Sequence, residues 1–307
     1  MKRSHAANGT PSVQRRPPSP GRRLWGLAAL ACAAVLIALL WAMAGKFASQ
    51  RRVAAEDSGA EDAMRQIFGA GAETSVQDPA RQSGAVPLIQ GAEPSVQSCA
   101  ARPLALSGEP EPFPYFDDLR AQNQDIAGLI DVNGRSMYVC QGSDNLYYMS
   151  HRFDRTQDAA GMIFLDCRCA IWPASDNLIL YGHNMRDGSR FGELKRYLEP
   201  DYLARHPSLR FATLYELGDY VPFAILLTSA DEDAPEYFDW ARTNFTGPED
   251  FDAFVSEAKA RSAIELPEEP VYGDRLLTLV TCSSALEDGR LVMLCKAVDA
   301  AEESGIM

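Results

Sequence analysis

Residues 276–294 read LLTLVTCSSALEDGRLVML, two apolar runs separated by a short polar connection. Runs rich in Leu, Val and Thr are typical of strands, and the pair Asp288-Gly289 is a turn signal, so the stretch predicts a β-hairpin. Cys282 closes the first run and Arg290 opens the second, which places a thiol near a guanidinium at one end of the hairpin. Because a nearby cation favours the thiolate, Cys282 is a candidate nucleophile. The alternative is an ordinary buried cysteine.

A second strand-like run ends in a histidine. Residues 176–185 read DNLILYGHNM, so His183 directly follows the apolar part. Loops at the end of a rigid sheet often carry function, which makes His183 a candidate acid–base group. The chain has four histidines, and the other three do not follow a strand directly. The alternative for His183 is simple packing at the rim of the core.

These pieces together resemble the sortase family, and class B sortases most closely. The resemblance rests first on residues 181–185 (YGHNM), residues 278–282 (TLVTC) and Arg290. Further signature-like stretches follow one another in family order: 123–130 (NQDIAGLI), 141–149 (QGSDNLYYM), 161–166 (GMIFLD) and 187–191 (DGSRF). The resemblance covers residues 112–298 approximately, and one departure is Val280, where the family usually has Ser. This position is expected to line the cleft, so the family's pentapeptide preference need not hold for this chain.

The predicted fold is mainly β. Short strands are expected at 126–132, 137–140, 162–165, 178–181, 209–214, 220–228, 276–281 and 291–297. Amphipathic helices are expected at Phe113–Gln124 and at Pro248–Arg261. Many short strands with few helices favour a closed barrel or a sandwich. The resemblance narrows this to the sortase-type eight-stranded β barrel with an N-terminal helix. The helix Pro248–Arg261 then lies in the insertion between the sixth and seventh strands, which marks class B.

The resemblance implies a cysteine transpeptidase. Cys282 would attack a peptide carbonyl as its thiolate and form a thioester, which divides one difficult step into two easier ones. His183 would donate and accept protons. Arg290 would position the substrate and stabilise the oxyanion. The implied donor is a secreted surface protein with a C-terminal sorting signal of the N-P-x-T type, cleaved after Thr. The implied acceptor is an amine of the peptidoglycan precursor lipid II, and no cofactor is implied.

Further positions match the family's substrate contacts. Asn145 and Met149 match residues that line the proline side of the groove, and Tyr181 precedes the Gly-His pair. Trp240 falls where class B members place an aromatic residue in the insertion. Thr281 precedes the nucleophile, where a backbone or hydroxyl donor could face the oxyanion. For each of them the alternative is ordinary packing, above all for Met149 and Trp240, because large apolar residues are mostly core.

The N-terminal third predicts an exported and anchored enzyme. The formal net charge is −13, but residues 1–23 carry +6 and no acid, which leaves −19 for the rest. So acidic a chain excludes nucleic acid as the partner. Residues 24–44 hold no charge and are long enough to cross a bilayer. The basic flank places residues 1–23 in the cytoplasm as a leader and the rest outside the cell membrane. A cleaved signal peptide is the alternative.

The remaining organisation is a stalk, a catalytic domain and a tail. Residues 45–110 are poor in aromatics and rich in small and polar residues, which predicts a flexible extracellular stalk with at most a short helix near residues 61–68. The sortase domain is expected at 111–300 and a tail at 301–307. No calcium-type cluster of carboxylates is evident, so no metal is expected.

The chain has seven cysteines, and four of them lie in the predicted sortase domain besides Cys282. Cys140 and Cys295 fall inside strand-like runs and are expected in the core. Cys167 and Cys169 are too close for a usual zinc pair, whose ligands stand two to four residues apart. A redox or metal role for them stays open, as do disulfides, because an exported domain permits them.

Three other functions use the same residues. A cysteine peptidase would transfer the acyl group to water. A pilin-polymerising sortase would transfer it to a pilin lysine. A non-catalytic surface module would only pack the cysteine, histidine and arginine.

Overall fold

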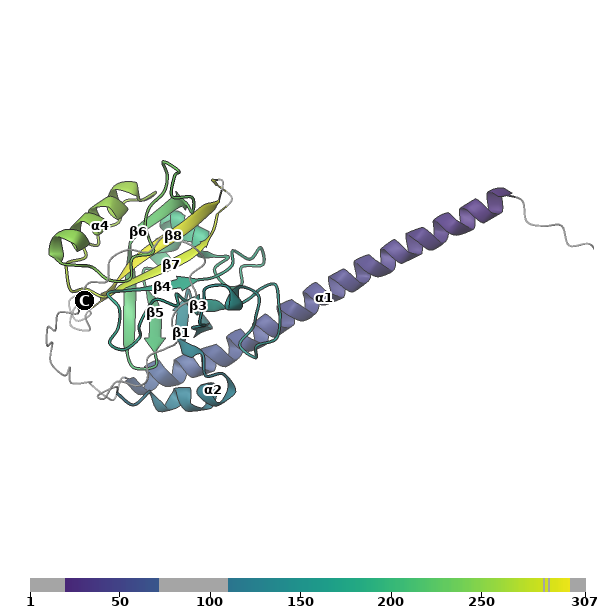
Figure 1. Ribbon diagram of the computed structural model, residues 1–307. Helices are drawn as coiled ribbons and strands as arrows, with labels where there is room; N and C mark the ends of the chain where they lie inside the picture. Colours follow the sequence, from purple (N-terminus) through teal and green to yellow (C-terminus); the bar gives the residue numbers. More distant parts are fainter. Residues whose placement is uncertain (1–19, 72–109, 284, 287, 299–307) are drawn as a thin grey trace, which may run out of the picture. The chain divides into compact units, whose positions relative to one another are not determined.

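The computed structural model describes residues 20–71, 110–283, 285–286 and 288–298, with the side chains of its first helix from residue 34 to 69. Within these residues, eight strands close into a barrel in the order β1-β2-β3-β4-β7-β8-β6-β5 (Figure 1). The strands are β1 (Ile126–Val132), β2 (Arg135–Cys140), β3 (Ile163–Leu165), β4 (Asn177–Tyr181), β5 (Leu209–Thr213), β6 (Leu217–Ser229), β7 (Leu276–Cys282) and β8 (Gly289–Val298). The predicted eight-stranded barrel is confirmed, and each predicted strand lies within three residues of an observed one.

Strand β7 lies at the centre of the arrangement that matters for function. It pairs in parallel with β4 and antiparallel with β8. Every residue of β7 from Leu276 to Thr281 is buried, and only Cys282 at its end is exposed. A strand buried on both faces reads as a continuous apolar run, which is why its sequence does not alternate.

The helices are short, apart from the first. They are α2 (Asp117–Gln122), α3 (Pro200–Arg205) and α4 (Pro248–Arg261), with 3-10 turns at Pro114–Phe116, Tyr147–Met149 and Leu194–Leu198. Helix α4 lies between β6 and β7 as predicted, and it buries the predicted apolar stripe of Phe251, Phe254, Val255 and Ala258. The predicted helix at 113–124 is instead a 3-10 turn followed by α2.

Helix α1 (Pro20–Gly71) differs from the expectation of a flexible stalk. From Arg51 onward it belongs to the same compact unit as the barrel. Its buried Val53, Ala60, Met64 and Ile67 are spaced seven, four and three residues apart, which forms one apolar stripe along a helix. Three of them join the barrel's hydrophobic core. The stalk prediction is therefore wrong for residues 51–69, because the apolar residues there are few but correctly spaced.

The other N-terminal predictions fall largely on residues that the structure does not describe. Three predicted segments lie outside the described residues: the leader at 1–23 except for residues 20–23, the rest of the stalk at 72–110 except for residue 110, and the whole tail at 301–307. The predicted span at 24–44 lies partly outside them, since side chains are described only from residue 34. In the described part of the chain, no helix has the length and hydropathy needed to cross a bilayer.

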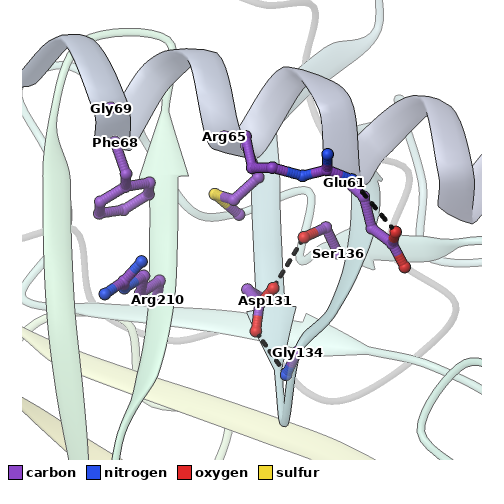
Figure 2. A pocket seen from close by; sticks show the side chains of 9 residues that line it. Glu61, Arg65, Phe68, Gly69, Asp131, Gly134, Ser136 and Arg210 are labelled. Atoms are coloured by element: carbon purple, nitrogen blue, oxygen red, sulfur yellow. Dashed lines mark hydrogen bonds and ion pairs between the residues drawn. The ribbon is translucent and has the colours of Figure 1, made fainter.

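A cavity of about 460 Å³ lies between the C-terminal part of α1 and the barrel (Figure 2). Arg65 and Phe68 line it from the helix, and Asp131 and Arg210 line it from the barrel. The Arg210 guanidinium lies 5.1 Å from the centre of the Phe68 ring. Neither Cys282 nor His183 lines this cavity.

The cysteines in the described residues fall into three states. Cys140, Cys169 and Cys295 are free and buried, and Cys282 is free and exposed. Cys167 forms a disulfide. A metal site built on the pair Cys167 and Cys169 is therefore excluded, because the disulfide occupies the first sulfur.

Candidate active site

Two chain segments that are far apart in sequence run side by side beyond the ends of β4 and β7. The amide of Gly182 donates to the Val280 carbonyl at 3.1 Å. The Thr281 hydroxyl donates to the Gly182 carbonyl at 2.7 Å, and the Asn184 amide donates to the Cys282 carbonyl at 2.8 Å. His183 and Cys282 are thereby placed on adjacent strand ends, with hydrogen bonds on either side of the histidine.

Gly182 permits this close approach. A Cβ at this position would lie 2.5 Å from the Ile163 side chain and 2.8 Å from the Phe191 ring. Any other residue would therefore require the Ile163 side chain and the Phe191 ring to shift. The glycine before His183 therefore has a packing reason that the sequence pattern alone does not reveal.

The His183 ring is held by a backbone carbonyl. Its Nε2 lies 2.7 Å from the carbonyl oxygen of Met149. Because a carbonyl only accepts, Nε2 must carry the hydrogen. Nδ1 has no hydrogen-bond partner among the described residues. It is therefore the ring nitrogen that can exchange a proton with a bound molecule.

Cys282 and Arg290 face each other across the β7–β8 hairpin. They are register partners in its antiparallel ladder, and directly opposed side chains in such a ladder start about 5 Å apart. The Cys282 side chain is exposed and Arg290 is half-buried. One guanidinium nitrogen, Nη1, donates to the carbonyls of Asp288 and Gly289, each at 3.0 Å. Within the described residues, Nε and Nη2 make no hydrogen bond and can bind a substrate oxygen.

Three of the five predicted substrate contacts, Asn145, Met149 and Tyr181, belong to segments that contain His183 or contact it. Met149 is 41% exposed, and its carbonyl holds His183. The Asn145 side-chain oxygen accepts the Cys167 amide at 2.9 Å, which leaves its NH₂ group for other partners. The Tyr181 hydroxyl donates to Asp166 at 3.1 Å. Burial and the Asp166 carboxylate raise the pKa of Tyr181, so the phenol stays neutral.

Asp166 anchors this side of the site from within the barrel wall. Its carboxylate is fully buried and accepts two hydrogen bonds from the Arg168 guanidinium, at 2.9 and 2.8 Å. Burial alone would raise the pKa of Asp166, but the bonds from Arg168 outweigh burial and lower the pKa. The pair holds the turn that carries the Cys167 amide, and so it supports Asn145.

At three positions singled out from the sequence, the structure favours the packing alternative or shows another partner. Trp240 is 8% exposed and belongs to the hydrophobic core, so ordinary packing accounts for it. The Thr281 hydroxyl donates its hydrogen to the Gly182 carbonyl, so this hydroxyl is not available to an oxyanion. The backbone donor at Thr281 stays a prediction. Val280 is 2% exposed, so the Ser-to-Val departure does not line an open cleft.

Sequence reasoning missed two backbone-fixing groups, Asn184 and the Met149 carbonyl. Asn184 directly follows His183, and a polar residue at that position was the available signal. Nothing in the sequence points to a carbonyl in the 141–161 segment as the partner of His183. In the part of the chain that is described, no group of three or more His, Cys, Asp or Glu side chains could hold a metal ion.

Comparison with known proteins gives a consistent picture. No family model matches the chain. It is similar to sortase B of Listeria monocytogenes, with 31% identity over 185 residues, which is 59% of this chain and 73% of the relative. It is also similar to sortase B of Staphylococcus aureus, with 30% identity over 189 residues, covering 60% of this chain and 75% of the relative. A solved Staphylococcus aureus sortase B–substrate complex superposes with a TM-score of 0.56 at 29% identity, covering 62% of this chain and 87% of that one.

Proposed function

This chain belongs to the class B sortase family of cysteine transpeptidases, and from that premise we propose that it anchors secreted surface proteins. It cleaves a C-terminal sorting signal of the N-P-x-T type after Thr and transfers the acyl group to an amine of the peptidoglycan precursor. The observation that carries this proposal is the adjacency of residues 182–184 and 280–282, with Arg290 opposite Cys282.

In the first half-reaction Cys282 is the nucleophile. Its thiolate attacks the threonine carbonyl, a sulfur–carbon bond forms, and the peptide C–N bond breaks. The departing amine takes a proton from the His183 imidazolium. The guanidinium of Arg290 donates to the developing oxyanion, where a fixed donor lowers the barrier.

In the second half-reaction the incoming amine replaces the peptide. The amine attacks the thioester and loses a proton to His183, and the Cys282 thiolate departs. The amide that forms joins the surface protein to its acceptor. His183 thus ends the cycle protonated, as it began, which is the balance that a general acid–base group requires.

The sorting signal is proposed to dock beside Met149. Leu146, Tyr147 and Met149 are 55%, 36% and 41% exposed, which is unusual for large apolar side chains adjacent to a buried barrel. Exposed apolar patches mark interaction sites. The patch adjoins His183 through the Met149 carbonyl. The NH₂ group of Asn145 has no hydrogen-bond partner within the described residues and can donate to a peptide carbonyl. The apolar and proline-containing part of the signal fits this surface.

The acceptor is tested with a fluorogenic Asn-Pro-any-Thr peptide and competing amines. With triglycine present, we expect the amide product to replace the free acid, and Cys282→Ala to form neither product. Free acid alone at saturating amine would indicate a peptidase instead. Transfer only to a peptide lysine would indicate pilus assembly.

We also propose that the enzyme is held at the cell membrane by residues 24–44, with residues 1–23 in the cytoplasm and the catalytic domain outside. The support is the uncharged stretch of 21 residues and the basic cluster that precedes it. Protease added to intact cells should remove the catalytic domain and leave the leader protected. Release of a shortened protein into the medium would indicate a cleaved signal instead.

A further inference from the structure

Two arginines are buried close to the site but take no part in the proposed chemistry. The side chains of Arg152 and Arg190 are 2% and 1% exposed. A buried guanidinium cannot lose its charge and needs a counter-charge nearby. Both find it on one side chain, Glu56 of helix α1. Arg152 binds one carboxylate oxygen at 2.9 Å, and Arg190 binds the other at 2.9 Å.

The two arginines belong to the two segments that hold His183. Arg152 lies three residues after Met149, whose carbonyl accepts the hydrogen on His183 Nε2. Arg190 lies on the other segment and forms a β-bridge with Asn184. The next residue, Phe191, donates its amide to the His183 carbonyl at 3.1 Å. One segment therefore fixes the ring of His183, and the other fixes its backbone.

The backbone conformation at Arg190 must be stabilised by contacts from other parts of the chain. Its φ angle is +52°, a left-handed conformation that a side chain such as Arg rarely adopts. Such a conformation persists when the surroundings over-determine it. Glu56 supplies such a contact directly, and Asp57 adds a longer one of 3.8 Å to the same guanidinium. Asp158 supports Arg152 at 3.4 Å from its own segment.

We propose that Glu56 is a positioning residue for His183. By binding Arg152 and Arg190 with its two oxygens, it ties the two His183-bearing segments to each other and to α1. The part of α1 after Arg51 is then required for proton transfer as well as for packing. This inference rests on the proposed acid–base role of His183, which it deepens.

The direct test is Glu56→Gln in the full-length enzyme, with Glu61→Gln as the matched control. Glu61 lies on the same helix, and its carboxylate pairs with Arg65 at 3.6 Å. We expect kcat for the sorting peptide to fall roughly 10- to 100-fold in Glu56→Gln, the cost of misplacing a catalytic group by about 1 Å. We expect KM to stay unchanged, and Glu61→Gln to stay within about twofold of the parent enzyme in both constants. Alkylation of Cys282 should proceed at the parent rate, because β7 does not depend on Glu56.

A variant that keeps the negative charge at position 56 distinguishes the positioning of His183 from simple neutralisation of the two buried arginines. Glu56→Asp retains the carboxylate near both arginines but is one methylene shorter, so it cannot reach both. We expect its melting temperature to lie near that of the parent enzyme while kcat is still reduced. A kcat for Glu56→Gln within about twofold of Glu61→Gln would overturn the proposal. So would a loss of kcat that follows the unfolded fraction, or one matched by slower alkylation of Cys282.

A spectroscopic measurement tests the inference without any substrate. The chain has four histidines, so nitrogen NMR of a histidine-labelled sample is tractable, and His183→Gln identifies the relevant signals. Spectra recorded at alkaline pH, where the His183 imidazole is neutral, should show the Nε2–H tautomer in the parent enzyme and a mixture in Glu56→Gln. An unchanged tautomer would overturn the inference even if the peptide is cleaved. A parent enzyme that shows the tautomer but cleaves no sorting peptide would refute the proposed function and leave this inference standing.

Discussion

The two ends of the β7–β8 hairpin carry the same residue type in opposite surroundings. Cys282 ends β7, is exposed and faces Arg290. Cys295 lies deep in β8, opposite Leu277 and Pro222, and is fully buried. Burial raises the pKa of the Cys295 thiol well above its ordinary value. The contrast shows that position at the strand end, rather than the cysteine itself, makes a thiol available for chemistry.

The largest expected contrast is in thiol labelling. A small alkylating reagent should modify Cys282 in the folded enzyme, whereas Cys140, Cys169 and Cys295 react only when the barrel opens. Unfolding equilibrium constants suggest a rate ratio of roughly 10³ or more. The check is mass spectrometry of labelled peptides with and without denaturant. Labelling of Cys295 at a rate comparable to Cys282 would break the comparison.

The next effect concerns the partner of the exposed thiol. His183→Ala should lower kcat by roughly 10²- to 10⁴-fold, the usual contribution of a general acid–base group. His206→Ala is the control, because His206 packs on the Tyr202 ring, with ring centres 4.6 Å apart. Steady-state kinetics on the sorting peptide measures both variants. Equal activities would remove His183 from the mechanism.

The buried thiol should reveal itself in alkaline stability. Because its folded pKa lies above the unfolded value of 9.0, the Cys295 thiol stabilises the fold fully below pH 9 and progressively less above it. At pH 10 the loss relative to Cys295→Ala should be on the order of 1 kcal/mol. Urea unfolding of both proteins between pH 7 and pH 10 provides the measurement. Parallel pH profiles would show that the thiol is not buried as described.

The smallest effect compares two threonines of the same strand. The Thr281 hydroxyl donates to Gly182 beside His183, and the Thr278 hydroxyl donates to Asn177 in mid-strand at 2.8 Å. Replacing either by Val should cost about 1 kcal/mol of unfolding free energy, the usual value of one such bond.

Only Thr281→Val should also lower kcat, by a few-fold. Of the two threonine bonds, only the one from Thr281 helps to set the spacing of His183 and Cys282. Thermal unfolding and peptide cleavage on both variants decide the matter. A similar fall in kcat for Thr278→Val would mean that strand-end position is irrelevant.

Much of the fold was predictable because its signals are local. Two apolar runs and the pair Asp288-Gly289 predict the hairpin at 276–294. An apolar stripe and a proline at the first position predict helix α4. The packing of α1 on the barrel was not predicted, because its four buried apolar residues are separated by small, polar and charged residues. For Trp240 and Val280 the sequence could not decide between packing and a place in the cleft, because a sequence position does not say which side chains are covered.

The candidate site divides in the same way. That Cys282 and Arg290 face each other follows from the sequence, since a short turn sets the register of a hairpin. That Asn184 bonds to Cys282, 98 residues away, and Arg190 to Glu56, 134 residues away, does not follow from it. A parallel pair such as β4 and β7 has no tight turn to set its register. The sequence also does not indicate which acidic residue will pair with a buried arginine. The sequence therefore determined which groups could react, and only tertiary packing decided which of them meet.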